Sequence, residues 1–350
     1  MGNYSIWQWV SDESVLQGFL TDCTIPTLIF VIIFCVAVLS FGADWMIDGV
    51  VSLAVKTGMP TILIGATIVS LGTTMPEAFV SVMAAYMGNP GLALGNGVGS
   101  IIADTGLIFG LTCLLVAMPV NRYILNRTGW VQIGAAVLLV TIAIQVLLVT
   151  PSESTPTLER WVGYLFLALL FLYLYASYRW SQDSGNQLSP NDERGGEQKS
   201  LGLSWVMIIG GLVLVVSGAR VLVTGASEVA VRFGVPDDVI AATMVAFGTS
   251  LPELMTAISA IRKGHPEITI GNIVGADVLN CLFVIGAAAV VAPLEIPANF
   301  YYFHFPAMLI ILISFRVFIS MNRAGTFYRW QGAWLLGIYG IYIYHQYAQI

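Results

Sequence analysis

The chain is dominated by a succession of apolar stretches, each long enough to cross about 30 Å of hydrocarbon. We expect ten transmembrane helices, at residues 25–53, 60–86, 91–118, 129–149, 158–179, 201–231, 236–261, 267–292, 302–320 and 327–348. Only 10% of the 350 residues are charged, which is too few to cover a water-facing surface. The sequence therefore predicts an all-α integral membrane protein and excludes a soluble enzyme or a nucleic-acid-binding protein.

A polar segment at 181–200 divides the predicted helices into two five-helix halves, at 25–180 and 201–350. Residues 1–24 contain no Lys or Arg, so they lack the positively charged region typical of a signal peptide. Their tryptophans predict either an interfacial segment or a terminus without fixed structure. Basic residues gather at alternate loops, so the positive-inside rule predicts a cytoplasmic 181–200 linker and two extracytoplasmic termini. The expected location is the plasma (inner) membrane. The cysteines and histidines lack metal or redox spacing, and we expect no cofactor and no obligate protein partner.

The two halves share an internal repeat. Residues 42–110 align without gaps to residues 218–286 at an offset of 176, and roughly a third of the paired positions are identical. Five predicted crossings separate the two copies, and an odd number of crossings means that the second copy enters from the opposite side. The sequence thus predicts inverted-topology halves, the architecture of secondary transporters, whose binding site lies near the midplane where the repeats meet.

Each copy carries a proline followed by a glutamate midway along a predicted helix. The two motifs are Gly72-Thr73-Thr74-Met75-Pro76-Glu77 and Gly248-Thr249-Ser250-Leu251-Pro252-Glu253. A mid-helix proline frees a carbonyl that needs another partner inside the bilayer. The hydroxyl residues lie three and four positions before each glutamate, on the same helical face. Carboxylate, hydroxyl and carbonyl oxygens are the ligands that Ca²⁺ and Na⁺ prefer, so each helix is a candidate cation site.

The next helix in each copy opens with a glycine-rich motif, GNGVGS at 95–100 and GNIVGA at 271–276. Glycines at four-residue spacing predict close packing of helix backbones. Asp104 lies four residues after Ser100, its repeat mate is Asn280, and Asp277 lies one turn before Asn280. Acids at membrane depth are costly and need a partner, which makes these side chains further candidates.

The paired motifs resemble the two alpha repeats of the sodium/calcium exchanger family, prokaryotic type, within the calcium:cation antiporters. The alpha-1 repeat lies at about 60–110 and the alpha-2 repeat at about 236–286, and the likeness extends over nearly the whole ten-helix layout. The resemblance implies an ion-gradient-driven antiporter, not an enzyme, that exchanges Ca²⁺ for Na⁺ by alternating access in a lipid bilayer. It also implies the ion ligands. These are the central Glu77, Glu253, Asp104 and Asn280, and for the flanking Na⁺ sites Thr73, Thr74, Ser100, Thr249 and Ser250, with carbonyls near Ser70 and Ala246.

The chain departs from this family pattern in three places. Asp104 and Asn280 are exchanged relative to some members, which conserves charge, so the central site is expected to survive. Ala276 stands where a serine is common and removes one hydroxyl from the outer Na⁺ site. Asp277 often corresponds to an asparagine. Its role stays open among an extra ligand, a proton acceptor, a gate residue and a group that faces a polar crevice.

The three central carboxylates carry a formal charge near −3, so one Ca²⁺ or three Na⁺ are acceptable loads but both together are not. We expect helices one and six to slide as a unit against the others, helped by glycines at repeat-related positions. These are Gly42, Gly49, Gly218 and Gly225. Asp44 and its repeat mate Arg220 are predicted to be structural charges rather than ligands.

Other functions stay open on the sequence alone. The nearest is a Ca²⁺/H⁺ or K⁺-dependent antiporter on the same fold, although no histidine neighbours Glu77 or Glu253. A remote one is an intramembrane aspartyl protease built on Asp104 and Asp277, which would not need two proline-broken helices in inverted copies. A passive cation channel is the third.

Overall fold

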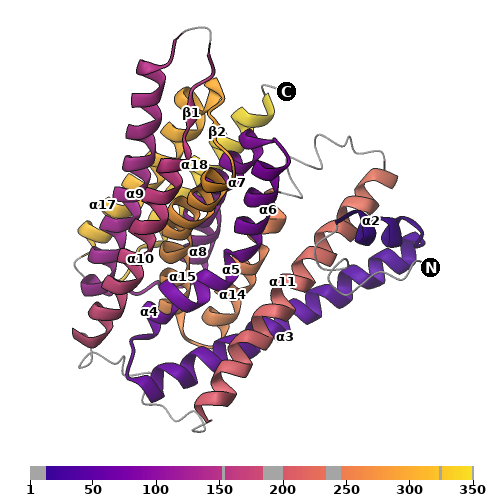
Figure 1. The fold of residues 1–350 in the computed structure, drawn as a ribbon. Coiled ribbons are helices and arrows are strands. Elements are labelled where there is room, and N and C mark those ends of the chain that lie inside the picture. Colours follow the sequence, from indigo (N-terminus) through magenta and orange to yellow (C-terminus); the bar gives the residue numbers. More distant parts are fainter. Residues whose placement is uncertain (1–12, 152–153, 184–199, 234–245, 323–324, 349–350) are drawn as a thin grey trace.

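The computed structural model describes residues 13–151, 154–183, 200–233, 246–322 and 325–348 (Figure 1). These residues are almost entirely helical. The helices before the polar segment are α2 (Glu13–Thr21), α3 (Ile25–Thr57), α4 (Thr61–Ile64), α5 (Ser70–Thr73), α6 (Met75–Tyr86), α7 (Pro90–Ala103), α8 (Gly110–Leu115), α9 (Arg122–Val149) and α10 (Arg160–Asp183). Those after it are α11 (Leu201–Arg232), α13 (Ala246–Thr249), α14 (Leu251–Arg262), α15 (Pro266–Leu279), α16 (Gly286–Val291), α17 (Phe305–Met321) and α18 (Arg329–Ala348).

In the described part of the chain, four π-helical segments interrupt or extend these helices, and two short strands pair with each other. The π-helical segments are η1 (Gly65–Val69), η2 (Asp104–Phe109), η4 (Asn280–Ile285) and η5 (Phe300–His304). The strands are β1 (Thr157–Leu158) and β2 (Leu294–Glu295), which pair antiparallel with Leu158 opposite Leu294.

Seven helices of the described part are long and apolar enough to cross a membrane. They are Ile25–Thr57, Pro90–Leu115, Arg122–Val149, Arg160–Trp180, Leu201–Arg232, Pro266–Val291 and Phe300–Met321. An eighth candidate is the pair Thr61–Thr73 and Met75–Tyr86, which meet at an angle of 42°. The expected helical membrane protein with several spans is confirmed. The start of the span predicted at 236–261, and most of the linker predicted at 181–200, lie outside the described residues.

Two predicted helix ends were wrong because capping residues extend the helices beyond their apolar stretches. The helix expected at 129–149 begins at Arg122, where the side chain of Asn121 accepts a hydrogen bond from the backbone N–H of Ile124. The helix expected at 25–53 continues to Thr57 and closes at Gly58, whose φ of 67° is the left-handed conformation that favours glycine.

Helices α3 and α11 lie side by side and extend away from the other helices (Figure 1). Glycines allow this close pairing: a Cβ at Gly42 would lie 2.7 Å from the Cβ of Leu214, and one at Gly49 would lie 2.8 Å from the carbonyl oxygen of Ser204. Gly218 faces Leu39 in the same interface. These glycines therefore pack α3 against α11. The sequence predicted that they help the pair to slide against the other helices, and this placement does not agree with that prediction.

The main hydrophobic core lies among the other helices. Its largest buried cluster draws side chains from α7, α9, α10, α15 and α17, and includes no described residue of α3 or α11. Residues of α3 and α11 instead belong to smaller clusters, one with Ile64 and Ile268 and one with Leu251. The fold thus consists of a packed helical body and an α3–α11 pair laid against it.

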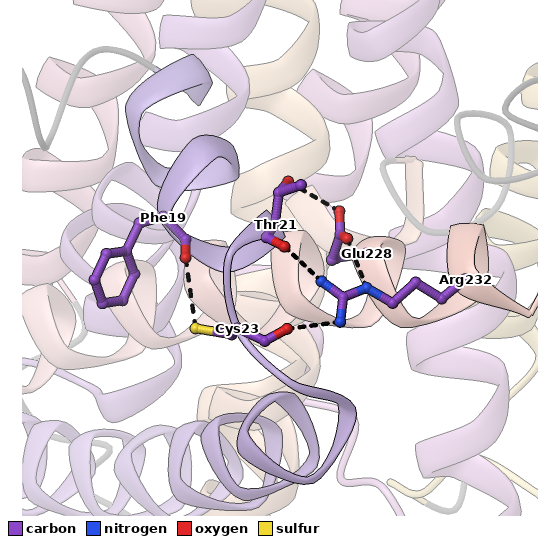
Figure 2. Close-up of polar contacts among 5 residues, drawn as sticks. All are labelled: Phe19, Thr21, Cys23, Glu228 and Arg232. Atoms are coloured by element: carbon purple, nitrogen blue, oxygen red, sulfur yellow. Dashed lines mark hydrogen bonds and ion pairs between the residues drawn. The ribbon is translucent and has the colours of Figure 1, made fainter.

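The described part of the N-terminal segment forms a helix that packs on α11. Leu16 and Leu20 are buried beside Val221 and Val229. The guanidinium of Arg232 donates hydrogen bonds to the carbonyl oxygens of Thr21 (2.7 Å) and Cys23 (2.6 Å). It also pairs with Glu228 at 2.9 Å, as Figure 2 shows. The beginning of α3 is therefore tied to the end of α11, while residues 1–12 of the predicted interfacial segment lie outside the described residues.

Candidate functional site

Two helices break at repeat-related positions beside the predicted glutamates. The first break lies at Thr74 (φ −81°, ψ −3°) between α5 and α6, and the second at Ser250 (φ −88°, ψ 6°) between α13 and α14. Pro76 and Pro252 lie in the first turn of the helix that follows each break, where a proline is tolerated because no helical N–H bond is needed. Each motif glutamate consequently lies in the first turn of its helix, at the positive end of the helix dipole.

Three carboxylates are buried around these breaks. Glu77, Glu253 and Asp104 are each only 1% exposed. Glu253 lies within electrostatic reach of both other acids. Four of their oxygens have no hydrogen-bond partner among the described residues, namely Oε2 of Glu77, Oδ1 of Asp104 and both side-chain oxygens of Glu253. Buried, unpartnered carboxylate oxygens close together are costly, and a bound cation would relieve both the repulsion and the lost hydration.

The hydroxyl groups of each motif lie at the carboxylates of the other copy. Thr249 lies at Glu77, and Thr73 lies near Glu253. Ser250 lies near Asp104. The structure therefore brings the two motifs together face to face, as the repeat predicted, and the resulting centre contains oxygen donors from both copies.

Asp104 and Asn280 each begin a π-helical segment, η2 and η4 respectively, 176 residues apart. The amide nitrogen Nδ2 of Asn280 donates a hydrogen bond to Oδ2 of Asp104 at 3.3 Å. A π-helical turn widens the helix locally and redirects its side chains, and such turns are frequent at functional sites. The direct contact shows that the predicted pair Asp104 and Asn280 lies together.

Two asparagines at the centre were missed by the sequence reasoning, although both stand in the glycine-rich motifs. Nδ2 of Asn96 donates to the backbone carbonyl of Glu77 (3.1 Å) and to Oγ of Ser81 (2.9 Å). Its repeat mate Asn272 accepts a hydrogen bond from the hydroxyl of Thr73 at 3.3 Å. Their duplication at the 176-residue offset was a signal that could have identified them.

Four other predicted residues, Ser70, Thr74, Ser100 and Ala246, make no described hydrogen bond to the three buried carboxylates. The carbonyl oxygen of Ser70 already accepts hydrogen bonds from the N–H of Thr74 (2.9 Å) and the hydroxyl of Thr73 (3.4 Å). The hydroxyl of Thr74 is buried and has no hydrogen-bond partner among the residues that the structure describes. Among the described residues, no hydrogen bond joins Ser100 to the central side chains. Ala246 is the first residue of α13, three residues before Thr249.

No group of three or more His, Cys, Asp or Glu side chains in the described part of the chain is arranged to hold a metal ion by itself. A cation at the centre therefore requires mixed donors, with carboxylate oxygens supplemented by hydroxyl, amide and carbonyl oxygens. That mixture suits the hard cations Ca²⁺ and Na⁺.

The two glycine-rich faces differ. In α15, a Cβ at Gly271 would collide with the carbonyl oxygen of Ile62, and one at Gly275 with Ala66 and Ser70, so the predicted close packing is confirmed there. In α7, a Cβ at Gly99 would meet nothing within 4 Å and one at Gly95 would lie 3.8 Å from Phe300, so the prediction was wrong for these two glycines, whereas Gly97 between them packs closely on Ile285 at 2.7 Å. The α7 face is partly exposed beside Asn96, which contacts Glu77, whereas the α15 face is fully buried.

Asp277 contacts side chains of η2 and α9. It is 2% exposed, and its Oδ2 accepts hydrogen bonds from the hydroxyl of Thr105 and from Nε2 of Gln132. Asp277 is within electrostatic reach of Asp104. Gln132 and Thr105 were not among the predicted site residues.

A helical membrane protein with several spans, and with acids buried at two repeat-related helix breaks, belongs to the class of ion transporters. The family profile of sodium/calcium exchanger proteins matches residues 27–179 and 203–348, and the chain belongs to this family.

Individual relatives extend over most of the chain. The sodium/calcium exchanger MaX1 of Methanosarcina acetivorans is 29% identical over 85% of this chain and 92% of its own length. The putative antiporter CaxA of Alkalimonas amylolytica is 34% identical over 76% and 81% of the two chains. The structure of the sodium-calcium exchanger NCX_Mj, soaked with Na⁺ and Sr²⁺, superimposes with a TM-score of 0.77 and 26% identity over 91% of this chain and 99% of that one.

Proposed function

We propose that this chain is a secondary active antiporter that exchanges Ca²⁺ for Na⁺ across the membrane by alternating access. The observation that carries the proposal is the buried centre, where Glu77, Glu253 and Asp104 meet with unpartnered oxygens beside hydroxyls of the opposite motif. Membership of the sodium/calcium exchanger family, and similarity to relatives such as the sodium/calcium exchanger MaX1, support Ca²⁺ and Na⁺ as the exchanged ions.

In this proposal Glu77, Glu253, Asp104 and Asn280 form the central site for Ca²⁺. The Na⁺ ions use the same carboxylates together with surrounding oxygens. Those are the hydroxyls of Thr73, Thr74, Ser100, Thr249 and Ser250, and carbonyls near Ser70 and Ala246. Because Ca²⁺ and Na⁺ compete for the same buried negative charge, occupation by one excludes the other, and this exclusion couples the two fluxes.

The proposed topology has ten crossings in two inverted halves, in the plasma membrane, with both termini extracytoplasmic. It is supported by the repeat-related features of the fold, since the breaks at Thr74 and Ser250 and the π-helical segments at Asp104 and Asn280 share the 176-residue offset. The distribution of basic residues supports the orientation.

Alternating access is supported by the unequal surroundings of the two copies. The α7 face at Gly99 is open, whereas the matching α15 face at Gly275 is packed against Ala66 and Ser70. The α3–α11 pair touches both breaks, because Leu212 covers Gly72 and Val223 covers Gly248. Movement of this pair relative to the packed body would open one side of the centre while it covers the other.

Tracer ⁴⁵Ca²⁺ uptake into proteoliposomes, under imposed Na⁺, K⁺ or pH gradients, tests the proposal. Wild-type protein should take up Ca²⁺ when an outward Na⁺ gradient is imposed, and Glu253→Gln should abolish this uptake because it removes charge from the centre. Glu295→Gln is the control, since Glu295 is an exposed acid in β2. Uptake driven by a pH gradient alone, or only with K⁺, would replace the Na⁺ assignment by one of the other antiport modes, and retained exchange in Glu253→Gln would refute the central site.

A further inference from the structure

We infer that Asp277, Gln132 and Thr105 form an additional binding site for a monovalent alkali cation beside the central site. A role of this site in transport rests on the proposed function, but the existence of the site does not. The three residues come from three elements, α15, α9 and η2, and are 2%, 2% and 0% exposed. None of the ion pairs in the described part of the chain involves Asp277, so no basic side chain neutralises it there.

Two oxygen atoms of this group lack partners. Oδ1 of Asp277 and Oε1 of Gln132 are buried and accept no hydrogen bond among the described residues. The orientation of the Gln132 amide is fixed by chemistry, because its nitrogen donates to Oδ2 of Asp277 at 2.5 Å and the reverse orientation would place two acceptors together. Buried acceptors that face no donor require a water or an ion, and the negative charge favours an ion.

The group is separate from the duplicated centre. The repeat mates of Asp277 and Thr105 are Ile101 and Cys281, which cannot form the same arrangement, and Gln132 lies outside the repeat. The site therefore exists in one copy only, next to Asp104 and within its electrostatic reach. A cation at Asp277 would reduce the repulsion between these two acids.

The donor set favours a monovalent cation. It contains one carboxylate and two neutral oxygens, from an amide and a hydroxyl, so a single positive charge neutralises it. A divalent ion such as Ca²⁺ prefers more ligand oxygens and more than one carboxylate. Counting Asp277, the four buried acids carry a formal charge of −4. One Ca²⁺ and one monovalent cation leave −1, the same balance that Ca²⁺ leaves at a centre with three acids.

Equilibrium binding of ²²Na⁺ and of ⁸⁶Rb⁺, as a probe for K⁺, tests the site in the purified full-length protein. The measurement is made in the Glu253→Gln background, in which cation binding at the central site is weakened. One alkali cation should still bind, and Asp277→Asn added to that background should lower its affinity at least tenfold. Gln132→Leu, which removes Oε1, should lower it as well, whereas the control Glu295→Gln should leave it unchanged.

Unaltered alkali-cation binding in the Asp277→Asn protein overturns the inference. So does a result in which Asp277 takes up and releases a proton but the protein binds neither ²²Na⁺ nor ⁸⁶Rb⁺. Retention of ⁴⁵Ca²⁺ binding by the single variant Asp277→Asn shows that this protein is folded. If Asp277→Asn does not fold, the alkali-cation affinity of Gln132→Leu tests the site instead. Comparison of the two isotopes distinguishes Na⁺ from K⁺. If wild-type vesicles show no Na⁺-driven Ca²⁺ uptake while Asp277→Asn still removes alkali-cation binding, the proposed function fails and the additional site stands.

Discussion

Thr73 lies between two residues of the opposite copy, the amide of Asn272 and the carboxylate of Glu253. Its single hydroxyl proton is shared between Oδ1 of Asn272 at 3.3 Å and the carbonyl oxygen of Ser70 at 3.4 Å, and the side chain lies near Glu253. The hydroxyl oxygen still has a lone pair for a cation while it donates its proton. Thr73 therefore both supports the contact between the copies and offers an ion ligand.

Thr73→Val, which keeps the shape and removes the hydroxyl, should lower the apparent Na⁺ affinity for exchange about tenfold, because one lost oxygen contact of this kind costs on the order of 1–2 kcal/mol. The measurement is the Na⁺ concentration that gives half-maximal ⁴⁵Ca²⁺ release. Thr128→Val is the matched control: Thr128 is also buried, but its hydroxyl donates a hydrogen bond to the carbonyl oxygen of Ile124 within its own helix, α9. Equal Na⁺ affinities in the two variants would contradict a ligand role for Thr73.

The candidate residues that could be predicted from the sequence are those that the repeat duplicates. Glu77 and Glu253 stand in matching motifs, and the offset connects Asp104 with Asn280. Gln132 could not be predicted, because it has no repeat mate and meets Asp277 only through the packing of α9 on α15. The open face at Gly99 also could not be predicted, since both motifs have glycines at four-residue spacing, Gly95 with Gly99 and Gly271 with Gly275, and the side chains that pack against them come from other helices.

At the level of helices, the bend at Thr74 places Glu77 at a helix start instead of a helix middle. Pro76→Ala would permit the helical hydrogen bond to the carbonyl of Gly72 and so join α5 to α6. We expect exchange to fall more than tenfold while the melting temperature is unchanged or raised, because the variant gains regular helix and loses the geometry of the centre. Exchange and thermal unfolding are measured on the same preparation.

Pro90→Ala serves as the control for this prediction. Pro90 also occupies the first turn of a helix, but it follows the capping residue Asn89 and not another helical segment. Its replacement should change exchange less than twofold. If Pro76→Ala exchanges as well as Pro90→Ala, the helix break is not needed for transport.

A second feature at this level is a pair of contacts between α3 and α14. Asp44 accepts a hydrogen bond from Ser259 at 2.5 Å, and one turn further along both helices Asp48 pairs with Lys263 at 2.6 Å. The repeat mates of Asp44 and Ser259 are Arg220 and Met83, and those of Asp48 and Lys263 are Thr224 and Met87, which cannot make the same contacts. The contacts therefore hold the α3–α11 pair to the body on one side of the molecule only. The prediction that Asp44 is a structural charge agrees with this placement.

Loss of the ion pair between Asp48 and Lys263 should shift the equilibrium between the states in which the centre is open to one or to the other side of the membrane. Asp48 and Lys263 are 44% and 27% exposed, and a pair at such a position contributes about 0–1 kcal/mol, equivalent to a change of up to about fivefold in the equilibrium. Asp48→Asn should change the ratio of apparent Ca²⁺ affinities at the two membrane faces by that factor, with little change in melting temperature. Ca²⁺ uptake by vesicles of defined orientation measures the ratio.

The reversed pair, Asp48→Lys combined with Lys263→Asp, should return the ratio towards the wild-type value, because it restores an ion pair of opposite polarity. High ionic strength should reduce the difference between wild type and Asp48→Asn. An identical ratio in all three proteins would show that this ion pair does not influence the conformational equilibrium.

At the scale of the whole molecule, the α3–α11 pair is fastened along its length. Arg232 ties the end of α11 to the chain before α3, the glycine contacts at Gly42 and Gly49 hold the middle, and Ser204 donates to Ser52 (Oγ to Oγ 2.8 Å) near the other end. The two helices contact each other more extensively than they contact the packed body, which they meet through Ser259 and Lys263 of α14 and through the clusters at Ile64 and Leu251. If transport requires relative motion, the motion should occur between the pair and the body, and not between α3 and α11.

Two crosslinks distinguish these possibilities. Ser52→Cys with Ser204→Cys is designed to join α3 to α11, and Asp44→Cys with Ser259→Cys to join α3 to α14, in both cases at a pair of side chains that are hydrogen-bonded to each other. Both are made in a Cys23→Ser background, because the three remaining native cysteines are buried. Oxidation should leave Na⁺-driven Ca²⁺ exchange within about twofold in the first protein and reduce it more than tenfold in the second, with recovery when the disulfide is reduced. Inhibition by the α3–α11 crosslink, or full exchange with the α3–α14 crosslink formed, would mean that the moving unit is not this helix pair.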